Sequence, residues 1–186
     1  MCLETRNSLQ QLAQEAASIE KILQILAVIS AYVESKGSKI VVVGTSAVAI
    51  YTFGGHLEQN IEIVFLGSDK ARTCFQQIGF YKESGRRWHH EDLKITLEVV
   101  DHELHGDLNK VVEFEIGERS VAVIGYEDLI IDCLHKAMHR GELNSQEQAL
   151  AILLTYYDFI DLPYLRRRAK EEKVIGLVEE LLEEID

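Results

Sequence analysis

An α+β fold, with a mixed β-sheet and flanking helices, is what this 186-residue sequence predicts. Apolar residues recur at helical spacing before residue 37 and after residue 125, and short β-branched and alternating runs fill the part between. The order is therefore helix, then mixed strands and helices, then helices to the end. We expect an N-terminal helical extension over 1–37, an α/β core over 38–125 and a C-terminal helical part over 126–186 packed on the core.

The N-terminal region predicts a long amphipathic helical segment between residues 8 and 36, made of one helix or two. Ser8 with Gln11 has the spacing of a capping box, and Gly37 provides a stop. The apolar stripe either packs on the domain or forms an interface with a protein partner or a second copy of the chain. The stripe comprises Leu9, Leu12, Ala16, Ile19, Leu23, Leu26, Ile29 and Val33.

A β-branched run over 39–43 predicts a buried strand, because Val and Ile suit the packed, pleated backbone. Glycines then separate the following periodic segments, as expected for turns and helix ends. The elements expected up to residue 79 are a strand at 39–43, a helix at 47–53 closed by Gly54 and Gly55, a strand at 61–66, and a helix at 69–78 stopped by Gly79.

Residues 94–100 alternate, which predicts a strand with its odd-numbered residues on one face and its even-numbered residues on the other. Two further strands, 111–116 and 120–124, flank a two-residue loop that begins with Gly117, the signal of a type II′ hairpin. From Tyr126 the pattern is helical, and Asp161 followed by Pro163 marks the start of a later helix.

Composition narrows the classes of function. The 31 acidic and 19 basic residues give a formal charge of −12, which opposes non-specific binding to DNA or RNA because phosphate contacts need clustered Lys and Arg. Three cysteines without a C-x-x-C pair argue against a disulfide framework or a cysteine zinc site. No apolar run is long enough to cross a membrane and no secretory signal is visible, so we expect a cytoplasmic protein with no membrane contact.

A constellation of polar residues surrounds the first two predicted strands. Gly44, Thr45 and Ser46 follow the first strand, and Asn60 and Glu62 open the second. Side chains at i and i+2 of a strand point to one face, so a short segment can supply both groups. A glycine turn lets backbone N–H groups approach an anion, and Ser46 would add a hydroxyl to a phosphate or simply cap the helix.

Together, these elements resemble the start of the nucleotidyltransferase superfamily, and more narrowly the abortive-infection-type, toxin-related nucleotidyltransferase-like proteins of bacteria and archaea. The resemblance covers residues 38–165 and includes the helix that begins at Tyr126. In that family a Gly-Gly-Ser or Gly-Gly-Thr turn precedes Asp-x-Asp, and a later strand supplies a third carboxylate. Here Asn60 and Glu62 stand at the two Asp positions; Glu98 best matches the third acid, with Asp101 as the alternative.

The resemblance implies Mg²⁺-dependent transfer of a nucleotidyl group from an NTP to an acceptor that the sequence does not identify. Two divalent ions would clamp the attacking and leaving oxygens, and Mg²⁺ prefers oxygen ligands. The implied catalytic and metal-binding residues are Glu62, Glu98 and Asn60. The implied nucleotide-binding residues are Gly44, Thr45, Ser46 and Lys136, the last one turn beyond the position where relatives often carry a basic residue.

Asn60 also supports a second hypothesis, since an amide offers a neutral oxygen in place of a carboxylate. In that case the same fold is catalytically degenerate and acts as a binding or regulatory module. The simplest alternative for Asn60 and Glu62 is a polar strand start that faces solvent, and for Glu98 an outward residue of a half-exposed strand.

The helix from Tyr126 carries a third candidate. His135 and His139 lie one turn apart, with Asp128 and Asp132 on the same face, so they form either a zinc site or a solvated face with an Asp132–Lys136 ion pair.

Three further segments concentrate charge. Residues 86–90, RRWHH, form a basic and aromatic patch that either contacts a nucleotide or is a surface loop or strand edge with a partly buried Trp88. Residues 101–105, DHELH, are capable of metal binding, although a plain loop is the simpler interpretation. Residues 166–168, RRR, predict a helix surface with ion pairs.

Overall fold

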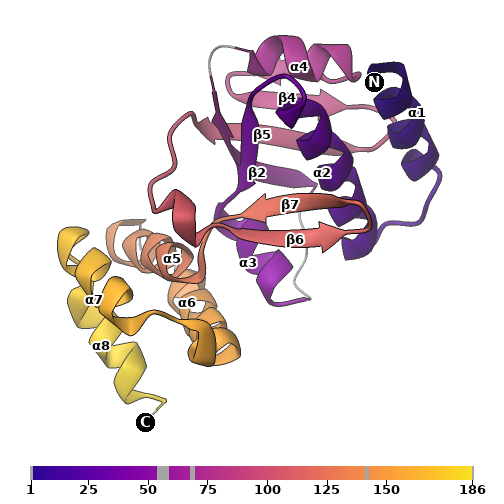
Figure 1. The fold of residues 1–186 in the computed structure, drawn as a ribbon. Coiled ribbons are helices and arrows are strands. Elements are labelled where there is room, and N and C mark those ends of the chain that lie inside the picture. Colours follow the sequence, from indigo (N-terminus) through magenta and orange to yellow (C-terminus); the bar gives the residue numbers. More distant parts are fainter. Residues whose placement is uncertain (1, 54–58, 68–69, 141–142, 186) are drawn as a thin grey trace. The chain divides into compact units, whose positions relative to one another are not determined.

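The computed structural model describes residues 2–53, 59–67, 70–140 and 143–185, and its elements confirm the predicted α+β fold class (Figure 1). Two compact units make up the chain. The first comprises Met1–Leu104 and Val111–Val123, and the second comprises His105–Lys110 and Ile124–Asp186. No helix among the described residues has the length and apolar character needed to cross a bilayer.

The first unit holds a mixed sheet of seven strands in the order β3-β4-β5-β2-β1-β7-β6. Strand β2 lies between β1, which runs antiparallel to it, and β5, which runs parallel. The elements of this unit are α1 (Cys2–Ala13), α2 (Ile19–Glu34), β1 (Lys39–Val42), α3 (Gly44–Tyr51), β2 (Asn60–Leu66), α4 (Ala71–Gln77), β3 (Tyr81–Ser84), β4 (Arg87–His90), β5 (Ile95–Asp101), β6 (Val112–Ile116) and β7 (Arg119–Val123).

The N-terminal segment is two helices rather than one. Helix α2 is capped by Ser18, whose hydroxyl accepts the backbone N–H of Lys21 at 3.1 Å, and the chain leaves it through Gly37 at φ 76°. The predicted capping box at Ser8 is wrong, because α1 already begins at Cys2 and places Ser8 inside the helix.

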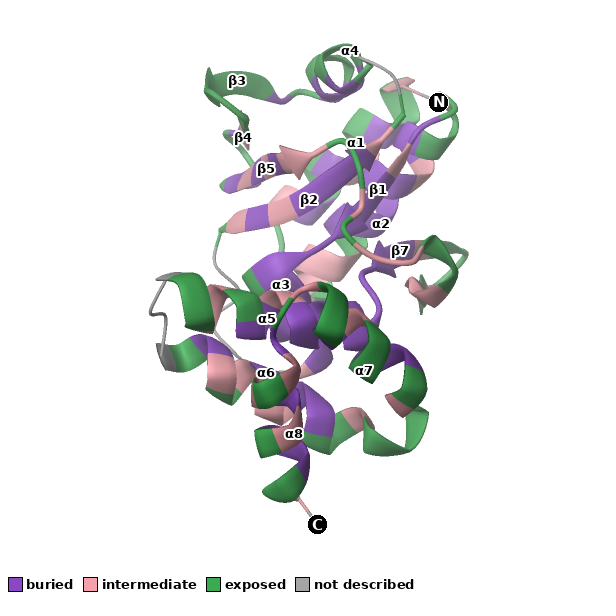
Figure 2. Cartoon of the chain, turned by 90° about the vertical axis from the view of Figure 1, so that its left-hand side faces the viewer, coloured by how far each residue is buried: buried purple, intermediate pink, exposed green. Residues whose placement is uncertain are grey.

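Helices α2 and α4 pack on the same face of the sheet. Helix α2 lies on β1 and β7, and its Tyr32 hydroxyl donates to Gln77 of α4 at 2.5 Å. Phe75 of α4 packs edge-on against Phe65 of β2, with ring centroids 5.7 Å apart, and lies 5.6 Å from Trp88 of β4. The central strands are accordingly buried, whereas edge strand β3 is exposed throughout (Figure 2).

The first short helix, α3, starts three residues earlier than predicted, at Gly44. The predicted glycine stop at Gly54 and Gly55 lies outside the described residues, as does residue 69 at the predicted start of α4. In the β6–β7 hairpin, Ile116 pairs with Arg119 and Gly117 has φ 64°, the positive value that the first position of a type II′ turn requires.

The RRWHH segment is a strand, β4, in a hairpin that the sequence pattern did not predict. Strand β3, its partner, is exposed on both faces, so it lacks the alternation by which a half-buried strand is recognised. Strand β4 lies between β3 and β5 and Trp88 is only 5% exposed, so the segment is neither a surface loop nor a sheet edge, and Trp88 is buried rather than partly buried.

The described part of the second unit consists of helices joined by short loops. The predicted helix start is confirmed: the Asp161 carboxylate caps α7 by accepting the N–H of Tyr164 at 3.0 Å, with Pro163 in the first turn. Its elements are η1 (Leu108–Lys110), α5 (Tyr126–Arg140), α6 (Leu143–Tyr156), η2 (Tyr157–Phe159), α7 (Leu162–Glu171) and α8 (Ile175–Glu183).

A buried histidine makes the first unit sensitive to acid. His90 is 7% exposed and lies edge-on to Phe80, with ring centroids 5.0 Å apart. Burial lowers the pKa of His90 below its usual 6.5, because the imidazolium loses hydration. The unfolded chain therefore binds a proton more readily, so stability is full above the unfolded pKa and is lost as pH falls towards the folded one.

We expect His90→Leu to flatten this dependence. The free energy of unfolding, measured by urea denaturation at neutral pH and at pH about 5, should fall less in the variant than in the wild type. His139→Leu, at an exposed position, is the control and should keep the wild-type dependence. Equal acid sensitivity of His90→Leu and the wild type would contradict the assignment.

Candidate functional site

The turn between β1 and α3 strongly favours glycine at its first position. Gly44 has φ 60°, a left-handed conformation that L side chains rarely adopt. A Cβ at this position would lie 2.1 Å from Oε2 of Glu62. The glycine therefore brings the backbone close to the carboxylate of β2.

Glu62 is bound by the start of α3. Its Oε2 accepts the backbone N–H of Thr45 at 2.8 Å and the Thr45 hydroxyl at 3.0 Å. Free N–H groups and the helix dipole make a helix N-terminus favourable for an anion. The Glu62 carboxylate itself takes up this position in α3.

Ser46 joins α3 to β2. Its hydroxyl oxygen accepts the backbone N–H of Glu62 at 3.1 Å and lies 3.5 Å from the carbonyl oxygen of Asn60. The interpretation of Ser46 as a helix cap is wrong, because the helix begins at Gly44 and the N-cap residue is Val43. The buried hydroxyl fixes the spacing between the turn and the strand.

Asn60, Glu62 and Glu98 lie on one face of the sheet. In the parallel pairing of β2 with β5, Glu62 stands opposite Glu98. The Asn60 side chain confirms the shared face, since its Nδ2 donates to Glu98 Oε2 at 2.9 Å. The solvent-facing alternative is therefore wrong for Asn60, which is half-buried and bound to another side chain.

A basic residue completes this face. Arg87 of β4 stands opposite Glu98 of β5, and its Nε lies 3.2 Å from the same Oε2 that accepts Asn60. One carboxylate oxygen thus receives both an amide and a guanidinium N–H. The sequence had placed Arg87 in a surface patch; only the pairing of β4 with β5 assigns it to Glu98.

The oxygen donors of this face are two carboxylates and one amide. Asn60 Oδ1 is buried and has no hydrogen-bond partner, so it is a buried acceptor left open on this face. Among the residues that the structure describes, no group of three or more His, Cys, Asp or Glu side chains is arranged to hold a metal ion. The donor set is one carboxylate short of the three that the resemblance implies, and Glu98 is already paired.

The other sequence candidates lie elsewhere. Lys136 belongs to the second unit, where its Nζ forms the predicted ion pair with Asp132 at 2.9 Å. His135 and His139 contact each other with ring centroids 4.3 Å apart. Asp101 ends β5, and its Oδ1 accepts the backbone N–H of His102 at 2.6 Å.

The fold of this chain is similar to that of two solved structures, one of which is described as nucleotidyltransferase-like. An antigenic nucleotidyltransferase-like protein from Paracoccidioides brasiliensis matches with a TM-score of 0.55 and 14% identity, over 73% of this chain and 77% of that one. The solution structure of the antibiotic-resistance factor ANT(2'')-Ia matches with a TM-score of 0.53 and 14% identity, over 82% of this chain and 91% of that one. No family model and no curated protein sequence matches the chain. The likeness establishes that the chain shares the fold of these two structures, which is the fold that the sequence resemblance implied.

Proposed function

We propose that this chain is a catalytically silent protein of the nucleotidyltransferase-like fold that acts as a binding or regulatory module. One observation carries the proposal: Glu98 Oε2 is held by both the Asn60 amide and the Arg87 guanidinium. Two-ion transfer requires ionised carboxylates that are open to the metal. Here the charge of Glu98 is already balanced from within the protein.

Glu62 supports the same conclusion. Its carboxylate accepts hydrogen bonds from the backbone N–H and the hydroxyl of Thr45, which would otherwise be open to a phosphate oxygen. A triphosphate would have to displace Glu62 and also approach a face that lacks the first carboxylate of the family pattern. Both features weaken nucleotide binding at this face relative to an active relative.

Isothermal titration of the purified chain with ATP, CTP, GTP and UTP, each with and without Mg²⁺, tests the proposal. We expect no Mg²⁺-dependent nucleotide binding at the acidic face, the sheet face that carries Asn60, Glu62 and Glu98. Metal-dependent nucleotide binding that disappears in Glu62→Ala would contradict the proposal that the protein is catalytically silent. It would also assign the nucleotide to this face.

Mg²⁺-dependent nucleotidyl transfer to an unidentified acceptor is the second candidate. It is favoured by the unpartnered Oδ1 of Asn60 on the face shared with Glu62 and Glu98. These three residues would hold Mg²⁺, which when bound would neutralise the triphosphate, while the segment 44–46 would contact the phosphates. On the sequence pattern alone, this second candidate would also be related to the abortive-infection-type, toxin-related proteins. It would be located in the cytoplasm.

Asn60→Asp discriminates the two candidates. Without metal, the new carboxylate replaces the donor to Glu98 with a like charge, so we expect a loss of about 1–2 kcal/mol in the free energy of unfolding. Added Mg²⁺ should recover much of that loss, because a cation can then bridge the introduced carboxylate and Glu98. The measurement is thermal unfolding with and without Mg²⁺.

The control is Asn60→Ala, which removes the donor but adds no charge. It should lose stability without recovering any in Mg²⁺. The transfer candidate would be favoured if Mg²⁺ stabilises the wild-type protein and does not stabilise the Glu62→Gln variant. If Mg²⁺ does not change the stability of the Asn60→Asp variant, the missing carboxylate is not what prevents metal binding.

A further inference from the structure

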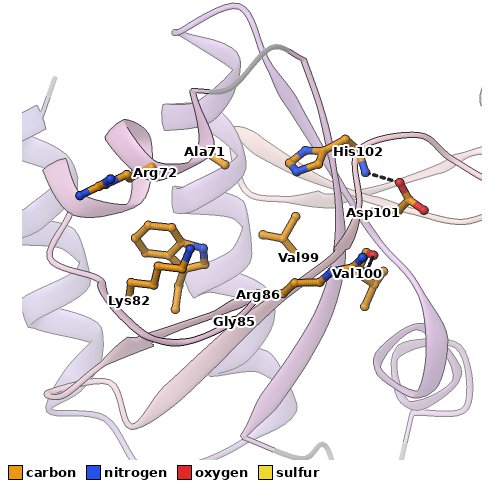
Figure 3. A pocket seen from close by; sticks show the side chains of 10 residues that line it. Ala71, Arg72, Lys82, Gly85, Arg86, Val99, Val100, Asp101 and His102 are labelled. Atoms are coloured by element: carbon orange, nitrogen blue, oxygen red, sulfur yellow. Dashed lines mark hydrogen bonds between the residues drawn. The ribbon is translucent and has the colours of Figure 1, made fainter.

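The opposite face of the sheet carries a pocket. Strand β4 makes this possible, because consecutive strand residues point to opposite faces: Arg87 pairs with Glu98 on the acidic face, whereas Trp88 packs with Phe75 under α4. The cavity there has a volume of about 400 Å³ (Figure 3). It is lined by Ala71, Arg72, Lys82, Gly85, Arg86, Trp88, Val99, Val100, Asp101 and His102.

Positive charge dominates the lining, in a chain whose formal charge is −12. Arg72 comes from α4, Lys82 from β3 and Arg86 from the turn between β3 and β4, and all three are exposed (Figure 3). No carboxylate among the described residues forms an ion pair with any of them. Arg86 Nη1 donates a hydrogen bond to the carbonyl oxygen of Val100, which holds the guanidinium beside the end of β5.

Among the described lining residues there are three cationic side chains and one carboxylate, that of Asp101, so the charge of these residues stays positive. Oδ1 of Asp101 accepts the backbone N–H groups of His102 at 2.6 Å and Glu103 at 3.3 Å, so it serves the turn that leaves β5. His102 adds a further polar ring, whose Nδ1 contacts the carbonyl oxygen of Phe65 at 3.2 Å. A carbonyl only accepts, so Nδ1 carries the proton in this contact.

The rest of the lining is apolar. Trp88, Val99 and Ala71 are 5%, 5% and 8% exposed. The Nζ of Lys82 lies 5.8 Å from the centre of the Trp88 ring, so the ammonium group is held over the indole. Ligand pockets of about 300–1,000 Å³ typically combine such an apolar surface with a few placed polar groups.

We propose that this pocket binds a small phosphorylated molecule with a ring-sized apolar part. A phosphate dianion presents several acceptor oxygens to donors that approach from different directions, which matches three cations from three segments of the chain. The ring lies against the apolar lining of Trp88, Val99 and Ala71. This inference does not depend on whether the acidic face transfers nucleotides, because the two faces share no lining residue.

Tryptophan fluorescence of the full chain tests the proposal, because Trp88 is the only tryptophan. The probes are phenyl phosphate, inorganic phosphate, benzoate and phenol. We expect a saturable change with phenyl phosphate, weaker binding of inorganic phosphate and benzoate, and no saturation with phenol. Phenyl phosphate that causes no saturable change, or that binds no more tightly than phenol or benzoate, would overturn the proposal.

Variants in which neutral glutamine replaces a cationic lining residue test whether binding occurs in the pocket. Arg72→Gln with Arg86→Gln should weaken the binding of phenyl phosphate about tenfold or more, since the phosphate loses two charge-assisted donors. Lys82→Gln alone should weaken it less, and circular dichroism checks that each variant is folded. The matched control, Lys21→Gln with Arg119→Gln, removes the same charge elsewhere in the unit and should bind as the wild type does. Equal losses in the two double variants would overturn the assignment.

Discussion

Asp128→Ala is expected to lower the free energy of unfolding of the second unit by about 3–5 kcal/mol, because it removes one partner of a buried ion pair. The Asp128 side chain has no exposed surface. Its oxygens accept the Tyr164 hydroxyl at 2.9 Å and the backbone N–H of Asp107 at 2.9 Å, and Arg168 Nε lies 3.3 Å away. The substitution leaves all three donors without an acceptor.

The Tyr164 phenol contributes to this network in its protonated form. Burial, and then the hydrogen bond to Asp128, raise the pKa of Tyr164 well above its usual 10.0. The hydroxyl therefore stays protonated at neutral pH and well above it, and donates to the Asp128 carboxylate. Asp128 thus ties helix α5 to both α7 and the loop that contains Asp107.

Asp132→Ala is the matched control for Asp128→Ala. Asp132 lies one turn further along α5, its side chain is 40% exposed, and it pairs with Lys136. We expect its loss to cost no more than about 1 kcal/mol, as for other exposed pairs. Urea denaturation followed by circular dichroism measures both variants. Equal costs would show that the Asp128 contacts are worth no more than a surface pair.

Gly44→Ala has the second largest expected effect, a loss of about 2–4 kcal/mol in the first unit. Alanine at φ 60° is strained, and its Cβ would meet Glu62 Oε2 at 2.1 Å. The flexible carboxylate must rotate away, which breaks its two hydrogen bonds to Thr45. Backbone strain and lost hydrogen bonds therefore add in one substitution.

A double-mutant cycle with Glu62→Ala separates the two contributions. Without the Glu62 carboxylate there is nothing for the new Cβ to displace, so Gly44→Ala should then cost only the backbone strain of about 1–2 kcal/mol. The free energy of unfolding of the four proteins gives the coupling. The same cost in both backgrounds would mean that the turn does not depend on Glu62.

Local pattern was enough to predict much of the core of the fold. The β-branched run over 39–43, the alternation over 94–100 and the glycine at the head of the last hairpin each predicted a strand or turn that the structure contains. Each signal arises from neighbouring residues, because side-chain period and turn conformation are local properties. Strand β3 escaped prediction because an edge strand exposed on both faces has no such period.

Helical spacing alone misjudged Asp128. The sequence placed it with Asp132 and His135 on one helix face, which is typical of a solvated surface. The structure buries Asp128 to 2% exposure, while His135 is exposed. Burial depends on what packs over each turn, and here Tyr164 and Arg168 of α7 supply partners from more than 30 positions further along the chain.

For the candidate site, the sequence by itself determined the chemical identity of the groups: an amide at 60 and carboxylates at 62 and 98, in strands whose period fixes which neighbours share a face. Only the tertiary structure decided how these groups are paired. The register of β5 against both β2 and β4 places Glu98 between Asn60 and Arg87. Strand register joins segments far apart in sequence, so no local pattern contains it, and it is this register that pairs the Glu98 carboxylate with side chains from two other strands.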